Sequence, residues 1–142
     1  SNLKMYKGIQ DTEKYLKKLE ENTKNINREE MELFIIPSYT SLPEAVSCCD
    51  SQMIKLGAQN MCWEDQGSLP EEISPCMLEE LGIKLVMIGH SERRHVFGES
   101  DIEENRKVKS ALRHGIRPLL CIGETAEEKK IRDQWGRFCA NS

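Results

Sequence analysis

The chain contains 142 residues with 20 basic and 24 acidic side chains, so its formal net charge is −4. Its apolar runs reach only four residues, far short of the roughly 18–20 that a membrane helix needs, and no secretory signal peptide is visible. The mild acidic balance without a basic stripe argues against nucleic acid as a partner. These features predict one domain over residues 1–142 that contacts neither membrane nor nucleic acid.

The six cysteines form no Cys-x-x-Cys pair, which is the spacing typical of zinc sites and redox motifs. The three histidines, His90, His95 and His114, do not complete a metal-ligand pattern with them. We therefore expect reduced thiols, a cytoplasmic location and no metal.

Residues 10–25 form the first predicted element, an amphipathic surface helix. Its apolar face carries Tyr15, Leu16 and Leu19. Two opposite-charge pairs lie four residues apart on the other face: Glu13 with Lys17, and Glu20 with Lys24.

Four short apolar stretches predict strands at residues 31–36, 54–59, 83–88 and 117–122. The last two are almost continuously apolar, which is typical of strands that are covered on both faces in a parallel sheet.

Helix start signals lie between these stretches. Two Ser-x-x-Glu capping boxes begin at Ser41 and Ser100, Ser74 precedes a proline, and Thr125 begins a further helix. Glycines at 82 and 115 end the helices before the last two strands. Strands and helices that alternate at a spacing of 33–34 residues predict an α/β fold with a parallel sheet and right-handed crossovers.

Ligands of parallel α/β folds bind at the carboxyl ends of the strands, where His90 follows the third predicted strand. If His90 lies near the N-terminus of a helix, the partial positive charge there disfavours the protonated imidazole. A neutral imidazole can donate its N–H to a substrate oxygen. The alternative is a histidine that only holds a turn. Residues 123–125 follow the fourth strand in the same way.

Asn2 and Lys4 lie near the amino end, where an upstream strand would end. Lys4 could face a phosphate or an enediolate, or be an ordinary solvated lysine. Asn2 could donate its amide to substrate or only cap a turn. Glu92 offers an acid or base beside His90, although Glu-Arg-Arg at 92–94, with Glu99, is more often a structural ion-pair network.

Several motifs along the chain resemble triosephosphate isomerase. They are Asn2-Leu3-Lys4-Met5, Gly57-Ala58-Gln59-Asn60, Trp63-Glu64-Asp65-Gln66-Gly67, Glu72-Ile73-Ser74-Pro75, Gly89-His90-Ser91-Glu92-Arg93-Arg94, Phe97-Gly98-Glu99 and Cys121-Ile122-Gly123-Glu124-Thr125. The resemblance runs in order from Asn2 to about Lys130, and the segment 131–138 does not share it.

The resemblance implies a (β/α)8 TIM barrel, which typically needs about 250 residues, so we expect a partial barrel of about five βα units. It implies a cytoplasmic, homodimeric enzyme of glycolysis and gluconeogenesis that acts on a sugar phosphate without metal or cofactor. The implied catalytic residues are His90 as a neutral electrophile, Lys4 as the cation and Glu92 as its carboxylate partner. Asn2 and Lys4 are the implied substrate-binding residues.

The chain also departs from the family pattern. It lacks the Tyr-Glu-Pro-Val-Trp run that carries the catalytic base, the lid loop and the later phosphate-binding loops. Leu69-Pro70-Glu71 replaces the family's Phe-Thr-Gly in the loop that reaches the neighbouring subunit. We therefore expect a chain that is incomplete at both ends and has negligible activity alone. Two alternatives are an isomerase of a four-carbon ketose phosphate and a non-catalytic half-barrel that binds sugar phosphates or a partner.

Overall fold

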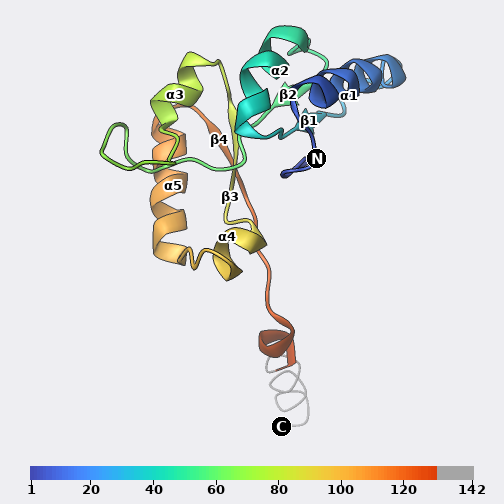
Figure 1. The fold of residues 1–142 in the computed structure, drawn as a ribbon. Helices are drawn as coiled ribbons and strands as arrows, with labels where there is room; N and C mark the ends of the chain where they lie inside the picture. The colour runs from blue at the N-terminus through green and yellow to red at the C-terminus, as the bar shows by residue number, and fades with distance from the viewer. Residues whose placement is uncertain (131–142) are drawn as a thin grey trace.

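A computed structural model of the chain describes residues 1–130 (Figure 1). Its elements in chain order are α1 (Ile9–Asn22), β1 (Phe34–Ile35), the 3-10 helix η1 (Tyr39–Ser41), α2 (Leu42–Cys48), β2 (Lys55–Leu56), α3 (Pro75–Glu80), β3 (Leu85–Ile88), α4 (Ser91–His95), α5 (Asp101–Arg113) and β4 (Arg117–Leu120). No helix among these residues has the length and apolar character that a membrane crossing requires.

The strands pair in parallel and follow one another in chain order. β1 pairs with β2, and β3 pairs with β4. Single parallel bridges connect Asn2 with Ile36 and Ala58 with Val86, so the segment before α1 lies beside β1, and the end of the β2 region lies beside β3. The predicted α/β class with parallel strands is confirmed.

All four strands are shorter than the predicted stretches. Before β1, the Met31 N–H donates to the Asn27 carbonyl at 3.0 Å, so the start of that stretch belongs to a turn. After β1, Pro37 has no N–H to extend the ladder. Regular pairing therefore covers only part of each apolar stretch.

β3 is buried along its whole length, as predicted, but β4 is not. Among the described residues, β4 pairs only with β3, which leaves its other edge without a neighbouring strand. Leu120 is 46% exposed and Ile122, beyond the strand, is 85% exposed. The prediction of a strand covered on both faces was therefore wrong for residues 117–122.

Most helix boundary predictions are confirmed. The Ser74 side chain accepts the Met77 N–H at the start of α3, and Ser100 and Glu103 form a reciprocal capping box at α5. Thr125 accepts the Glu128 N–H at 3.2 Å where a further helical turn begins. Gly82 and Gly115 take positive φ angles of 74° and 65° just beyond α3 and α5.

Two local predictions were wrong. Ser41 forms no capping bond with α2, because it ends η1 in a helical conformation and its hydroxyl accepts from Ser38 at 3.2 Å. The pair of Glu20 with Lys24 does not form either, since α1 ends at Asn22 and Glu20 accepts the Asp50 N–H at 2.8 Å. The other predicted pair, Glu13 with Lys17, is present at 2.5 Å.

Two apolar clusters form the core, one beside β1 and the other beside β3. The first lies between α1, α2 and β1 and contains Leu3, Leu16, Ile35, Ala45 and Ile54. The second packs β3 against α3 and α5 through Val86, Ile88, Leu78, Ile83 and Ala111, among others. Burial of Leu16 confirms the predicted inner face of α1.

Candidate active site at the carboxyl ends of the strands

His90 lies where β3 ends and α4 begins. Gly89 between them has φ +74°, and a Cβ there would lie 2.8 Å from the Glu104 carboxylate. This turn therefore needs glycine for both its backbone conformation and its close contact. This turn places the His90 imidazole at the start of α4, where it accepts the Glu92 N–H as the N-terminal capping group. The His90 side chain is 21% exposed.

Lys4 enters the same region from the segment beside β1. Its backbone takes φ +50°, which is uncommon for a residue other than glycine. Two contacts hold it: the Lys4 N–H donates to Asn2 Oδ1 at 2.9 Å, and Gln59 Nε2 donates to the Lys4 carbonyl at 2.9 Å. Gln59 also donates to Asn2 Oδ1 at 3.2 Å, so one amide fixes both residues.

Glu92 connects the two parts of the site. Its Oε1 lies 2.7 Å from Lys4 Nζ, and its Oε2 lies 2.5 Å from His90 Nδ1. The hydrogen bond from Lys4, together with its positive charge, lowers the pKa of the Glu92 carboxyl. The same carboxylate raises the pKa of Lys4. Glu92 is therefore ionised and Lys4 is charged at neutral pH.

His90 Nδ1 has two neighbours that require different protonation states. The Glu92 N–H, 3.3 Å away, requires a lone pair on Nδ1, whereas the Glu92 carboxylate requires a proton there. The carboxylate contact is 0.8 Å shorter (3.3 − 2.5), and we assign the proton to Nδ1 on that basis. In a neutral imidazole with its proton on Nδ1, Nε2 is an acceptor.

These side chains line one cavity of about 450 Å³. Its polar wall carries Asn2, Lys4, Gln59, His90 and Glu92, and its apolar rim carries Met5, Tyr6, Met87, Val96 and Phe97. A neighbouring cavity of about 660 Å³ lies between His90 and the segment 123–125. All three places predicted from the strand ends thus lie around His90.

The charged residues next to His90 form a structural network, as predicted. Arg93 Nε lies 3.2 Å from Glu99 Oε2, and the buried Lys107 pairs with the other oxygen of Glu99. Lys107 Nζ also donates to Asn60 Oδ1 at 2.9 Å. This network ties the loop after β3 to α5 and to the end of the β2 region.

Sequence reasoning missed the roles of Gln59 and Lys107. Gln59 is the last residue of the second predicted strand, so the strand-end rule that selected His90 would also have selected it. Lys107 gave no such signal, because a lysine inside an amphipathic helix is normally solvated. Within residues 1–130, one group of three mixed metal-ligand side chains lies together, Asp65, Cys76 and His114, and it shares no residue with this cavity.

Comparison with known proteins identifies the family that the sequence motifs resemble. The family model described as triosephosphate isomerase matches residues 1–140, so the expectation that segment 131–138 does not share the resemblance was wrong. Segment 131–138 lies outside the described residues. Relatives named triosephosphate isomerase are 45% identical in Dictyoglomus thermophilum, 42% in Aquifex aeolicus and 40% in Alkaliphilus metalliredigens.

Each of these alignments covers 91–92% of this chain and 51–52% of the relative. The chain thus spans about half the length of the curated relatives it matches. The site residues from Asn2 to Glu92 all fall within the matched family region. The chain belongs to the triosephosphate isomerase family.

Proposed function

We propose that this chain supplies the Lys4–His90 part of an active site that interconverts dihydroxyacetone phosphate and D-glyceraldehyde 3-phosphate through an enediolate. The observation that carries the proposal is the convergence of Lys4 and His90, 86 positions apart, on one cavity through a shared carboxylate. The 40–45% identity to relatives named triosephosphate isomerase supports the same reaction. We extend the proposal to a role in glycolysis and gluconeogenesis, in the cytoplasm.

Lys4 supplies a fixed positive charge for the phosphate and for the negative charge that develops on the enediolate oxygens. Asn2 adds an amide whose carbonyl oxygen is already used by Lys4 and Gln59, so its Nδ2 remains directed toward the cavity side, 3.8 Å from the Met87 sulfur. Both residues are thereby proposed as substrate-binding groups.

His90 acts as the electrophile in this proposal. To donate a hydrogen bond to a substrate oxygen it needs its proton on Nε2, and Nδ1 must then accept the Glu92 N–H. A shift of the Glu92 carboxylate away from the imidazole on substrate binding, with its contact to Lys4 kept, produces this tautomer. Glu92 is a positioning carboxylate here, because its pairing with Lys4 keeps it ionised.

The proton on the substrate carbon requires a separate general base. The family motif that carries this base does not occur in the sequence, so we propose that the 142-residue chain alone has negligible isomerase activity. The five parallel segments in chain order support a single-domain partial (β/α)8 barrel. Exposed Leu69, Val96 and Phe97 supply apolar surface for a homodimer of the complete protein.

An isomerase assay on the complete gene product, with the 142-residue chain in parallel, tests the proposal. We expect His90→Gln and Lys4→Met to lower kcat by about 10²–10³-fold in the complete protein, the usual loss for one preorganised electrostatic group. Lys14→Met, which changes an exposed lysine of α1, is the matched control and should have no effect. Unchanged kcat in His90→Gln contradicts the assignment, and ordinary turnover by the chain alone contradicts the need for an external base.

A second candidate is a non-catalytic half-barrel that assembles with a partner. The unpaired β4 edge, with Ile122 85% exposed just beyond it, and Met5, 95% exposed in the segment beside β1, favour this function. Sedimentation of the chain distinguishes the candidates, because a monomer that does not aggregate argues against assembly. Comparison of triose with tetrulose phosphates on the complete protein tests the four-carbon alternative.

A further inference from the structure

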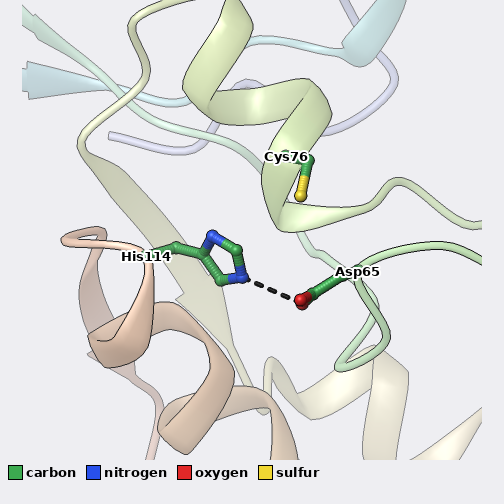
Figure 2. Close-up of side chains that lie close together, drawn as sticks. All are labelled: Asp65, Cys76 and His114. Carbon is green, nitrogen blue, oxygen red and sulfur yellow. Dashed lines mark hydrogen bonds and ion pairs between the residues drawn. The ribbon is translucent and has the colours of Figure 1, made fainter.

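Asp65, Cys76 and His114 lie close together (Figure 2). Asp65 comes from the long segment between β2 and α3, Cys76 from the first turn of α3, and His114 from the end of α5. One candidate ligand atom from each side chain lies within 4.8 Å of the other two. His114 precedes the amino end of β4, whereas His90 follows the carboxyl end of β3, and α3 and α4 lie at opposite ends of β3 (Figure 1).

We propose that these three side chains bind a zinc ion that fastens the segment between β2 and α3 to the end of α5. Thiolate, imidazole and carboxylate are the three side-chain ligands that Zn²⁺ takes in proteins. A thiolate and a carboxylate also neutralise the two charges of the ion, with His114 neutral. A water molecule completes the four-coordinate shell, as in other zinc sites with three protein ligands.

The spacing of the ligand atoms fits this ion after small side-chain movements. Zinc bond lengths and a tetrahedral angle require neighbouring ligand atoms to be about 3.3–3.6 Å apart. His114 Nε2 and Asp65 Oδ1 are 2.9 Å apart, and the Cys76 sulfur lies within 4.8 Å of its partners. The longest separation therefore exceeds the required one by at most about 1.2 Å (4.8 − 3.6). Cys76 is a free thiol and only partly buried, so its side chain has room to rotate.

His114 is also oriented as a metal ligand. Its Nδ1 lies 2.9 Å from Glu79 Oε2, which leaves Nε2 facing Asp65. A carboxylate on the other ring nitrogen is the usual outer partner of a zinc-bound histidine, because it fixes the tautomer and increases ligand basicity. Glu79 is therefore the positioning residue of the site.

A simple ion-pair cluster accounts for only part of this arrangement. An imidazolium between Asp65 and Glu79 explains both 2.9 Å contacts and the raised pKa of His114, whose main causes are those two carboxylates. It gives no reason for a cysteine sulfur beside them. The zinc site gives a role to Asp65, Cys76, His114 and Glu79. Because only the zinc site requires the sulfur, substitution of Cys76 distinguishes it from the ion-pair cluster.

Cobalt titration of the full metal-free chain tests the proposal, with a phosphine reductant to keep the thiols reduced without competing for the metal. Because Co²⁺ reports sulfur ligation, we expect one equivalent to produce a near-ultraviolet sulfur-to-cobalt charge-transfer band that Zn²⁺ then abolishes. Cys76→Ala should lose the band, and Glu79→Gln should weaken the apparent affinity about 10–100-fold. Cys48→Ala, which removes a thiol on α2, is the matched control and should behave as the unchanged chain.

A second measurement keeps the test independent of spectroscopy. Zn²⁺ should raise the thermal unfolding midpoint of the unchanged chain and of Cys48→Ala but not that of Cys76→Ala, because a ligand that binds only the folded state stabilises it. Absence of the charge-transfer band in the unchanged chain, or its persistence in Cys76→Ala, overturns the proposal. Unchanged affinity in Glu79→Gln overturns the outer role of Glu79.

Discussion

Gly89 and Gly82 provide a matched test of how the fold holds His90 in place. Both glycines have φ +74°, so an alanine at either position must adopt the same unfavourable backbone conformation. At Gly82 the added Cβ meets nothing within 4 Å. At Gly89 it meets the Glu104 carboxylate at 2.8 Å and Arg94 at 3.1 Å. The difference between the two substitutions therefore isolates the steric contact.

We expect Gly82→Ala to lower the free energy of unfolding by about 1–2 kcal/mol, the cost of a left-handed conformation for a residue with a Cβ. Gly89→Ala should cost that amount plus about 1–3 kcal/mol, because the Cβ displaces Glu104 from Arg94. Glu104 is only 2% exposed, and its Oε1 already has no hydrogen-bond partner within residues 1–130. A Glu104 carboxylate displaced from Arg94 would therefore be buried without a hydrogen-bond or ion-pair partner.

Urea unfolding of the full chain, followed by circular dichroism, measures both costs. Glu104→Ala removes the obstructing carboxylate, so the additional cost of Gly89→Ala over Gly82→Ala should disappear in that background. Equal costs for the two alanine substitutions in the unchanged chain would refute the argument that Glu104 requires a glycine at position 89. A cost that persists without Glu104 would refute it as well.

Three further predictions concern stability. Ser100→Ala should lower the free energy of unfolding by about 1 kcal/mol through loss of the α5 cap, as measured by urea unfolding; no change would contradict the capping role. Leu16→Ala should cost about 2–5 kcal/mol, because Leu16 is fully buried between α1 and β1, and a loss under 1 kcal/mol would contradict this packing. The Lys4–Glu92 pair should stabilise the folded chain only at intermediate pH. Because the pKa of Glu92 is lowered in the folded chain, the contribution of Glu92 to stability is complete above about pH 4.3 and is lost as pH falls through the folded pKa. Lys4 has a raised pKa, so its contribution is complete below about pH 10.4 and is lost as pH rises through the folded pKa. Glu92→Gln should remove both dependences from thermal unfolding midpoints, and an unchanged pH profile would contradict the pairing.

Local signals in the sequence predicted the features that depend on local contacts. Ser74 and Ser100 cap their helices because the capping bond spans only three residues. The same reasoning was wrong at Ser41, since a 3-10 turn before α2 changed the backbone conformation that a cap requires. A capping signal therefore specifies a helix start only where extended chain precedes it.

Features that depend on distant contacts were only partly predictable. The strand-end rule placed Lys4 and His90 at the same edge, but it gave no information on Glu92 bridging them at 2.7 and 2.5 Å. The cluster of Asp65, Cys76 and His114 gave no signal at all, because its members are 11 and 38 positions apart and come from different elements. Metal-ligand spacing in a sequence detects sites within one turn or hairpin and misses sites that tertiary packing assembles.

Lys4 is one of two residues other than glycine within 1–130 that take a positive φ angle, and the other is Glu71. At Gly82 and Gly115, positive φ angles occur with glycine, at no steric cost. Lys4 takes φ +50° with a full side chain, at a cost of about 1–2 kcal/mol. Glycine would relieve that strain but would remove the ammonium from the cavity. The hydrogen bonds from Gln59 to the Lys4 carbonyl and from the Lys4 N–H to Asn2 offset the cost, and they hold the strained backbone that carries the Lys4 ammonium to the cavity, in keeping with the proposed role of this charge.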